Sequence, residues 1–229
     1  MARHFLVVVT GLLAEARLAN PASGRTIAGG ADAARLETQI DRALSEGAGA
    51  VLSFGVAAGL EPGRAPGALV VPHEVIGASG RYATDARWSE RMRSALRNCD
   101  SSPLIGVDSP LIRPADKVQL HSTTGAIAAD MESHIVARLA VRAGRPFAVL
   151  RVIADPAERG LPAAAIIGMK PGGGVNVIGV LASLLRNPRQ LPDLARVATD
   201  VRIAMQVLNL CRTLLGPDLG WVPDASPAP

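Results

Sequence analysis

The sequence predicts a single α/β domain in which helices cover a layered β-sheet, and three observations lead to this prediction. Short apolar runs typical of buried strands alternate along the chain with segments of helical periodicity. Hydrophobic residues make up 48% of the composition and aromatic residues only 3%, so the core is expected to consist of Ala, Val, Leu and Ile. A chain of 229 residues is long enough to bury a substantial core. We expect residues 1–221 to form the domain and residues 222–229 a loose tail.

The predicted strands are short apolar runs that lack helical periodicity. The first, residues 5–9, reads FLVVV, which is typical of a strand buried on both faces. Gly11 then lets the chain turn, and Pro72 ends the third run. In chain order, the strands are expected at residues 5–9, 51–54, 68–71, 104–107, 126–129 and 147–154.

The predicted helices lie between these strands and after the last of them. The clearest is residues 131–143, where an apolar stripe that includes Ile135 and Leu139 faces away from several arginines. Gly47 and Gly49 are expected to end the helix that precedes them. We interpret the apolar stripe of the last helix as packing on the sheet rather than on a membrane. In chain order, the helices are expected at residues 12–19, 31–46, 85–97, 131–143, 177–185 and 192–215.

Composition and charge argue against several classes of protein. Lys and Arg number 24 against 20 Asp and Glu, but no basic run is interleaved with aromatic residues, so nucleic acid is not expected as a partner. A weak attraction to an anionic membrane surface stays open. Two widely separated cysteines, and the lack of a secretory signal or of an apolar run of ~20 residues, predict a cytoplasmic protein, at most peripheral to the membrane. The four histidines lack the spacing of metal ligands, so no metal is expected.

Four features follow predicted strand ends, which is where α/β sheets bind ligands. They are Glu15, the segment Gly55–Gly59, Glu132 and Asp155. We expect Gly55–Gly59 to be a loop whose small residues let the backbone approach a ligand closely. Each acid also has an ordinary explanation when taken alone, Glu15 as a solvated helix residue and Asp155 as part of an Asp-Pro turn.

Glu132 has the most informative position of the three acids. Asp130 is expected to cap the following helix, which places Glu132 in the first turn, where the helix dipole favours an ionised carboxylate. Its spacing from Ile135 and Val136 turns it inward. A buried carboxylate needs a partner, and the two hydroxyls of a ribose would provide one. The alternative is a carboxylate that only caps the helix.

Together these segments resemble the purine nucleoside phosphorylase/nucleosidase superfamily, over about residues 7–157. Gly11–Glu15 is similar to its Gly-x-x-x-Glu, and Ser53–Leu60 to its Asn-Thr-Gly-Ser-Ala-Gly-Gly-Leu. Ala126–Glu132 is similar to its Ala-Ile-Ala-x-Glu-Met-Glu, and Arg151–Asp155 to its Arg-x-Ile-Ser-Asp. The resemblance implies a three-layer α/β sandwich with a twisted mixed central sheet, and a homo-oligomer.

The hopanoid-associated branch of this superfamily is a closer match. Its members resemble this chain around Thr10–Arg17, in Ala129–His134, and in Asp155-Pro156 with Leu161-Pro162 beyond. That branch is associated with the release of adenine from adenosylhopane, so the implied substrate is a purine nucleoside whose 5′ end carries a large triterpenoid. Two alternatives stay open: a nucleosidase for methylthioadenosine or S-adenosylhomocysteine, and a non-catalytic nucleoside-binding protein.

The resemblance also implies roles for individual residues. Asp155 would protonate or hydrogen-bond N7 of the purine, and Glu15 would act as a general base on an attacking water. Glu132 would bind the ribose hydroxyls and stabilise positive charge on the sugar. The implied substrate-binding residues are Glu132, Met131, Leu111, Val56, Ala57 and Ala58. No cofactor is implied, although phosphate stays open as a co-substrate.

Several positions depart from the superfamily's pattern. Val56 stands where relatives have a serine that contacts phosphate or water, Ala154 replaces another serine, and Pro110 stands where nucleosidases often have a phenylalanine. No arginine directly precedes Gly55. These departures weaken the case for phosphate, whereas Glu15 favours water, so both nucleophiles stay open with a preference for water. The apolar residues 161–169 are interpreted either as a core element or as an apolar wall for the triterpene tail.

Overall fold

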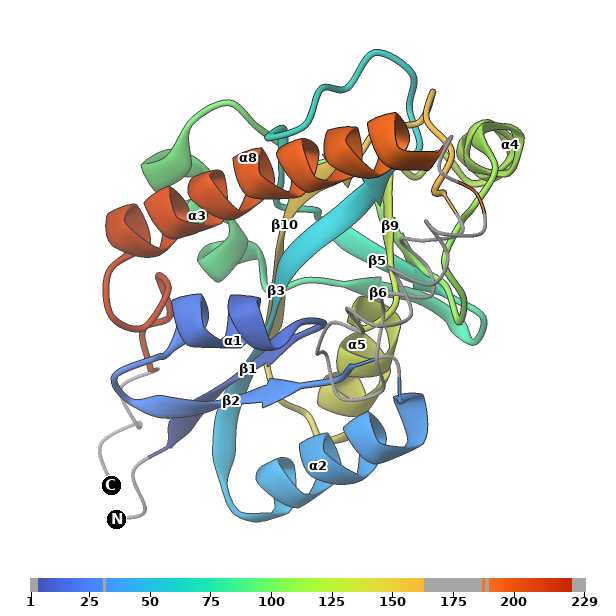
Figure 1. Ribbon diagram of the computed structural model, residues 1–229. Helices are drawn as coiled ribbons and strands as arrows, with labels where there is room; N and C mark the ends of the chain where they lie inside the picture. Colours follow the sequence, from blue (N-terminus) through green and yellow to red (C-terminus); the bar gives the residue numbers. More distant parts are fainter. Residues whose placement is uncertain (1–3, 31, 163–186, 188–189, 224–229) are drawn as a thin grey trace, which may run out of the picture.

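The computed structural model describes residues 4–30, 32–162, 187 and 190–223. Helices cover both faces of a mixed β-sheet of ten strands in this part of the chain, which confirms the predicted three-layer α/β fold (Figure 1). The strands are β1 Phe5–Thr10, β2 Gly24–Ala28, β3 Ala48–Gly59, β4 Leu69–Val70, β5 Glu74–Gly77, β6 Gly80–Ala83, β7 Cys99–Asp100, β8 Leu104–Gly106, β9 Ala128–Asp130 and β10 Phe147–Asp155. The helices are α1 Leu13–Ala19, α2 Ala33–Ser45, α3 Ala86–Leu96, α4 Pro114–Thr124, α5 Ser133–Arg142 and α8 Leu191–Leu215.

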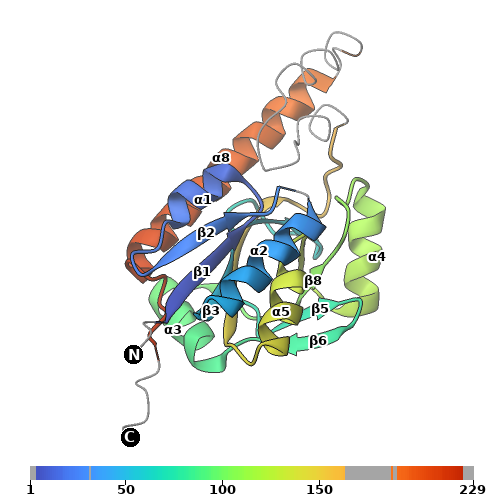
Figure 2. The same cartoon turned by 90° about the horizontal axis from the view of Figure 1, so that it is seen from below.

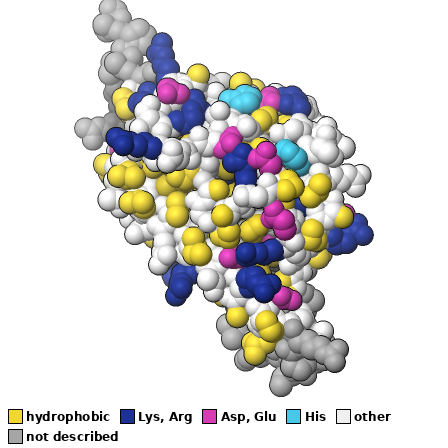
Figure 3. All heavy atoms as spheres, turned by 90° about the horizontal axis from the view of Figure 1, so that it is seen from above, with side chains coloured by type: hydrophobic (Ala, Val, Ile, Leu, Met, Phe, Trp, Pro, Cys, Tyr) yellow, Lys and Arg dark blue, Asp and Glu magenta, His cyan; other side chains and the backbone are white. Residues whose placement is uncertain are grey.

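The two faces of the sheet are buried by different helices. Side chains alternate along a strand, so Val7 and Val9 of β1 pack with α2 and α5, whereas Leu6 and Val8 pack with α3 and α8. Helix α4 lies apart from both layers, near β8, which pairs with β5 and β9, and Leu120 of α4 packs near Ile105 of β8 (Figure 2). On the face shown in Figure 3, acidic side chains are interspersed with the basic ones. No helix in the described part of the chain is long and apolar enough to cross a membrane.

Strand β3 is the centre of the sheet, and its two edges have different neighbours. Strand β10 runs parallel to it along one edge, from Val51 to Ala58. On the other edge, β1 runs parallel to β3 and pairs with it as far as Ser53. Strand β9 is antiparallel to β3 on that same edge and pairs with Ala58 and Gly59. Strands β1 and β9 therefore run towards each other along β3, and residues 54–57 face a gap between their ends.

The segment Gly55–Gly59 is not the predicted loop, because β3 continues through it without a break. Steric crowding still explains why a small residue is needed in this segment. A Cβ on Gly55 would lie 2.7 Å from Arg151 Nη1 and 2.7 Å from Glu15 Oε1, which are closer contacts than real side chains make. Only a glycine at this position lets the two charged side chains reach the gap in the sheet.

Some element boundaries also differ from the prediction. Strand β9 is Ala128–Asp130 rather than residues 126–129, and α5 begins at Ser133 rather than at residue 131. The short strands β2, β5, β6 and β7 were not predicted, nor was α4, whose one buried residue is a lysine rather than an apolar side chain. The predicted helix at residues 177–185 and the apolar residues 163–169 lie outside the described part of the chain.

Candidate active site

A cavity of about 300 Å³ opens beside the gap in β3, next to the facing ends of β1 and β9 and the end of β10. All eight residues predicted as site residues lie on its wall: Glu15, Val56, Ala57, Ala58, Leu111, Met131, Glu132 and Asp155. Segments from five parts of the sequence therefore meet in one place. The roles given to these residues remain predictions, because their position alone does not test them.

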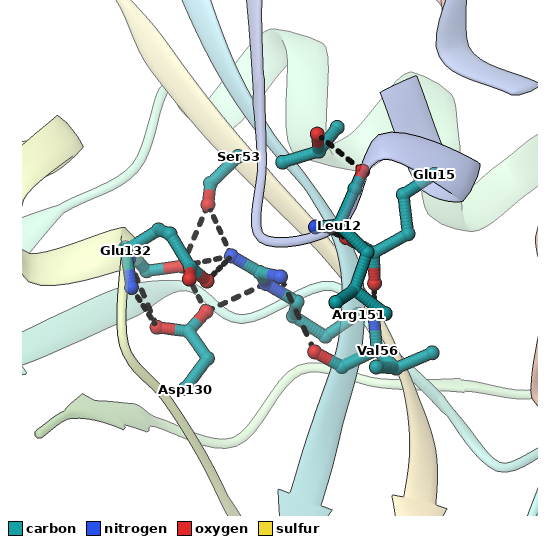
Figure 4. Close-up of polar contacts among 9 residues, drawn as sticks. Leu12, Glu15, Ser53, Val56, Asp130, Glu132 and Arg151 are labelled. Carbon is teal, nitrogen blue, oxygen red and sulfur yellow. Dashed lines mark hydrogen bonds and ion pairs between the residues drawn. The ribbon is translucent and has the colours of Figure 1, made fainter. Parts of the chain in front are cut away.

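Arg151 is a central site residue for which the sequence had given no role. It comes from the middle of β10, and its side chain is only 1% exposed. Its Nε lies 2.6 Å from Asp130 Oδ2, and its Nη2 lies 3.2 Å from Glu132 Oε2 and donates to Ser53 Oγ at 2.7 Å (Figure 4). A buried guanidinium needs negatively charged and hydrogen-bonding partners of this kind. The available signal was a charged residue inside an otherwise apolar strand.

Glu15 and Arg151 together bind the backbone of Val56 inside the gap. Glu15 Oε1 accepts a hydrogen bond from the Val56 N–H at 2.8 Å, and Arg151 Nη1 donates to the Val56 carbonyl at 3.2 Å. These side chains replace the strand neighbour that β3 lacks at this point. The second oxygen of Glu15 accepts from the Leu12 N–H at 2.8 Å, which closes the first turn of α1. Burial raises the pKa of Glu15, and the nearby Arg151 opposes this shift.

Glu132 is buried, as predicted, but its local structure differs from the prediction. It precedes α5 as the N-cap residue instead of lying inside the first turn. The helix dipole was expected to favour its ionised form, yet burial raises the pKa of Glu132 to about 7, with Arg151 acting in the opposite direction. Desolvation therefore outweighs the favourable position at the helix end. A Cβ on Gly11 would lie 3.0 Å from Glu132 Oε1, so the glycine leaves room for this carboxylate.

Asp130 supports the site from behind Glu132. Its Oδ1 accepts hydrogen bonds from the backbone N–H groups of Glu132, at 3.2 Å, and Ser133, at 2.9 Å. Its Oδ2 binds the Ser133 hydroxyl and is paired with Arg151. Asp130 thus fixes the turn from β9 into α5 while it balances the arginine, which leaves an oxygen of Glu132 for another partner.

Asp155 lies at the end of β10 and belongs to a separate charge pair. Its side chain is 17% exposed, and its Oδ2 lies 2.7 Å from Nζ of Lys117 on α4. Burial raises the pKa of Asp155, and the Lys117 ammonium opposes this effect. The cavity therefore contains one acid that pairs with a lysine and two acids that lie beside an arginine.

The rest of the cavity wall is mainly apolar. Leu111, Pro110 and Val107 lie on it together with Met131, and Leu161 lies beyond the end of β10. Helix α8 contributes Val197 and Val201. Such a cavity, with apolar walls and a few carboxyl groups held by defined partners, is suited to an organic ligand that has both an apolar part and hydroxyl or basic nitrogen atoms.

The sequence matches a family model described as the phosphorylase superfamily over residues 2–169. No curated protein matches the chain.

Solved structures with the same fold include nucleosidases and a hydrolase. A methylthioadenosine/S-adenosylhomocysteine nucleosidase mutant of Helicobacter pylori, with 5′-methylthioadenosine in its active site, is 13% identical with a TM-score of 0.62, covering 91% of this chain and 98% of its own. The S-adenosylhomocysteine nucleosidase of Streptococcus pyogenes is 17% identical with a TM-score of 0.59, covering 93% and 99%. The futalosine hydrolase of Helicobacter pylori is 16% identical with a TM-score of 0.57, covering 68% and 89%. At these identities the likeness shows the fold.

Proposed function

Because the chain belongs to the phosphorylase superfamily, we propose that this enzyme cleaves the N-glycosidic bond of a purine nucleoside in the cavity beside β3. The observation that carries the proposal is that the carboxyl groups of the cavity have different charged partners. Asp155 is partly exposed and pairs with Lys117, whereas Glu15 and Glu132 lie beside Arg151. This arrangement provides a proton donor for the base and a negatively charged group of residues for the sugar.

The leaving base needs a proton, and Asp155 is the proposed donor. As the bond from C1′ to N9 breaks, its electron pair moves into the purine, and a proton delivered to N7 lets the base leave neutral. The raised pKa of Asp155 makes it easier for this carboxyl group to carry the proton during the reaction. The positive charge that develops on the ribose is then stabilised by the carboxylates.

Glu132 and Glu15 have different proposed tasks. Glu132 accepts hydrogen bonds from the ribose hydroxyls with the oxygen that Arg151 does not engage. Glu15 takes a proton from the attacking water, whose oxygen forms the new bond to C1′. Both oxygens of Glu15 already accept one backbone hydrogen bond, so its orientation is fixed before the ligand arrives.

The charges around the cavity favour water over phosphate as the nucleophile. Arg151 does reach Gly55, although no arginine precedes that glycine in the sequence. Its charge, however, is balanced by Asp130 and Glu132, and Glu15 lies close by. A phosphate dianion would meet more carboxylates than cations here, which disfavours its binding.

The group at the ribose 5′ carbon is proposed to be large and apolar, as in adenosylhopane. Support comes from the sequence segments shared with the hopanoid-associated branch and from the apolar side chains of Leu161, Val197 and Val201 on the cavity wall. Methylthioadenosine is the second candidate, because a solved structure with the same fold holds it in its active site.

Release of adenine from adenosylhopane and from methylthioadenosine, each with and without phosphate, tests the proposal. We expect release from adenosylhopane without phosphate. Release only from methylthioadenosine would overturn the choice of 5′ group, and a requirement for phosphate would overturn the choice of nucleophile. Nucleoside binding without release from any purine nucleoside would support a non-catalytic binding protein.

A further inference from the structure

Helix α4 places a buried lysine directly behind the proposed proton donor. Lys117 is 0% exposed, and it is the one buried residue of this helix. Its Nζ lies 2.7 Å from Asp155 Oδ2 and donates hydrogen bonds to the carbonyls of Pro156, at 3.0 Å, and Arg159, at 2.8 Å. Two carbonyls accept hydrogen bonds from the ammonium group, and the carboxylate is in ion-pair contact with it. The lysine is therefore fixed in place, with the carboxylate as its only charged contact among the described residues.

Resting on the proposed function, we propose that Lys117 is a positioning residue that orients Asp155 and supplies, through it, the proton that the purine receives. Oδ2 of Asp155 is buried and faces the lysine, and because Asp155 also lies on the cavity wall, its other oxygen is the one available to a ligand. The pair shares one transferable proton, stored as ammonium and carboxylate at rest.

The proton given to the purine comes from the pair, and the proton that restores the pair comes from the attacking water through Glu15 and the solvent. The Lys117 ammonium gives a proton to Oδ2, which leaves an amine and a carboxylic acid. The carboxyl group turns about its Cβ–Cγ bond, so that its proton faces the cavity and the amine donates to the other oxygen. The proton moves to N7 as the bond from C1′ to N9 breaks. Asp155 is then a carboxylate. After the base has left, Glu15 releases to the solvent the proton that it took from the attacking water, and the solvent returns a proton to the amine.

The other charged groups near Asp155 do not offer this proton. Asp200 of α8 is paired with Arg159, and an arginine does not release its proton in proteins. Glu158, in the segment after β10, is bound by the N–H of Gly63. Among the described residues, Lys117 is the cation that touches the carboxylate, and unlike an arginine a lysine can transfer a proton.

The pH profile of kcat/KM for K117M separates this role from a purely electrostatic one, because the two predict opposite shifts. If the lysine holds the proton, its removal leaves an acid that loses its proton earlier. The alkaline fall in activity should then move to lower pH by one unit or more, with at least a tenfold loss at pH 8. If Asp155 carries its own proton, removing the nearby positive charge should move the fall to higher pH, and this result would overturn the proposal.

K117R is the matched control, since it keeps the charge but cannot give up a proton. We expect it to lose activity at pH 8 like K117M, and full activity would overturn the proposal. Thermal unfolding and binding of adenine identify variants that fail to fold.

A measurement on the wild-type protein needs no variant. The chain has only two lysines, Lys117 and Lys170, so protein labelled with ¹⁵N-lysine gives two side-chain amine signals. We expect one of them to titrate together with the alkaline fall in kcat/KM, and an unchanged pair of signals across that fall would contradict the inference. Absence of base release by the wild-type protein would instead refute the proposed function itself.

Discussion

Asp155 and Glu132 differ in the partners that hold them, and at the scale of single residues this difference separates their tasks. Asp155 faces a lysine, which can exchange a proton, whereas Glu132 faces an arginine, which cannot. The first partner suits a group that must gain and lose a proton in each turnover. The second suits a group that must stay in place and bind as a carboxylate.

Asp155→Asn should reduce base release by at least about 10²-fold, because the amide cannot donate an acidic proton to N7. Binding of the nucleoside should persist, since the two side chains have nearly the same shape. Release can be followed by chromatography and binding by calorimetry. Asp200→Asn is a matched control, because Asp200 influences Asp155 without lying on the cavity wall. Equal rates for Asp155→Asn and wild type would contradict the assignment of the acid.

Binding of the nucleoside should strengthen as the pH rises through about 7, because Glu132 accepts the ribose hydroxyls as a carboxylate. Between pH 6 and pH 8 the ionised fraction rises from about a tenth to about nine tenths, so we expect a roughly tenfold gain in affinity. The Asp155→Asn variant allows this measurement without turnover. Adding Glu132→Gln should remove the pH dependence, and a dependence that survives this change would count against Glu132.

At this scale the sequence could predict the carboxylates but not their partners. Glu15, Glu132 and Asp155 were identifiable because each follows a predicted strand next to a recognisable segment. Arg151, in contrast, binds Ser53 and Val56, which lie 98 and 95 residues away in the chain. No local pattern encodes such pairs, since they arise only when the strands meet.

Strand β3 links the structure of the site to the sheet at the scale of secondary-structure elements. Gly55→Ala would place a methyl group 2.7 Å from both Arg151 Nη1 and Glu15 Oε1. We expect a loss of about 1 to 3 kcal/mol in the free energy of unfolding, together with reduced base release. Gly59→Ala is the matched control, because its methyl group would lie 3.2 Å from Ile153 Cγ2 and away from the charged groups. Urea unfolding and activity assays of both variants test this, and equal losses would refute the steric argument.

The elements that were predicted share one property, namely apolar residues arranged either in a continuous run or in a stripe of helical spacing. The runs at β1, β3 and β10 and the stripe of α5 are such cases. Helix α4 was missed because its buried position holds a lysine, so the pattern showed no apolar stripe. The end of β3 was misjudged because small residues resemble a loop when the charged side chains that require them are unknown.

At the scale of the whole molecule, the buried acids make stability depend on pH. The pKa of Glu132 is about 7 in the folded state against 4.5 as its ordinary value, so the folded protein binds this proton more tightly than the unfolded chain. Its contribution is fully present below pH 4.5 and is lost as the pH rises through about 7. The raised pKa values of Glu15 and Asp155 act in the same direction.

Between pH 5 and pH 8, the wild-type free energy of unfolding should therefore fall by roughly 2 to 3 kcal/mol relative to Glu132→Gln, which does not titrate at that position. Urea unfolding at several pH values in this range measures the difference. Parallel curves for the two proteins would show that Glu132 does not hold its proton as inferred.

The gap along β3 has a consequence for how this enzyme can change during evolution. Glu15 and Arg151 form hydrogen bonds with the backbone of Val56 in addition to their place in the proposed active site. A lineage that no longer needs the reaction therefore cannot lose these two residues without weakening its sheet. Selection for a stable fold alone would keep both residues in place. Asp155, whose side chain pairs with Lys117 rather than with the backbone of the described strands, has no such second task. Among descendants that have taken up other tasks, its loss is therefore the earlier sign that catalysis has ended.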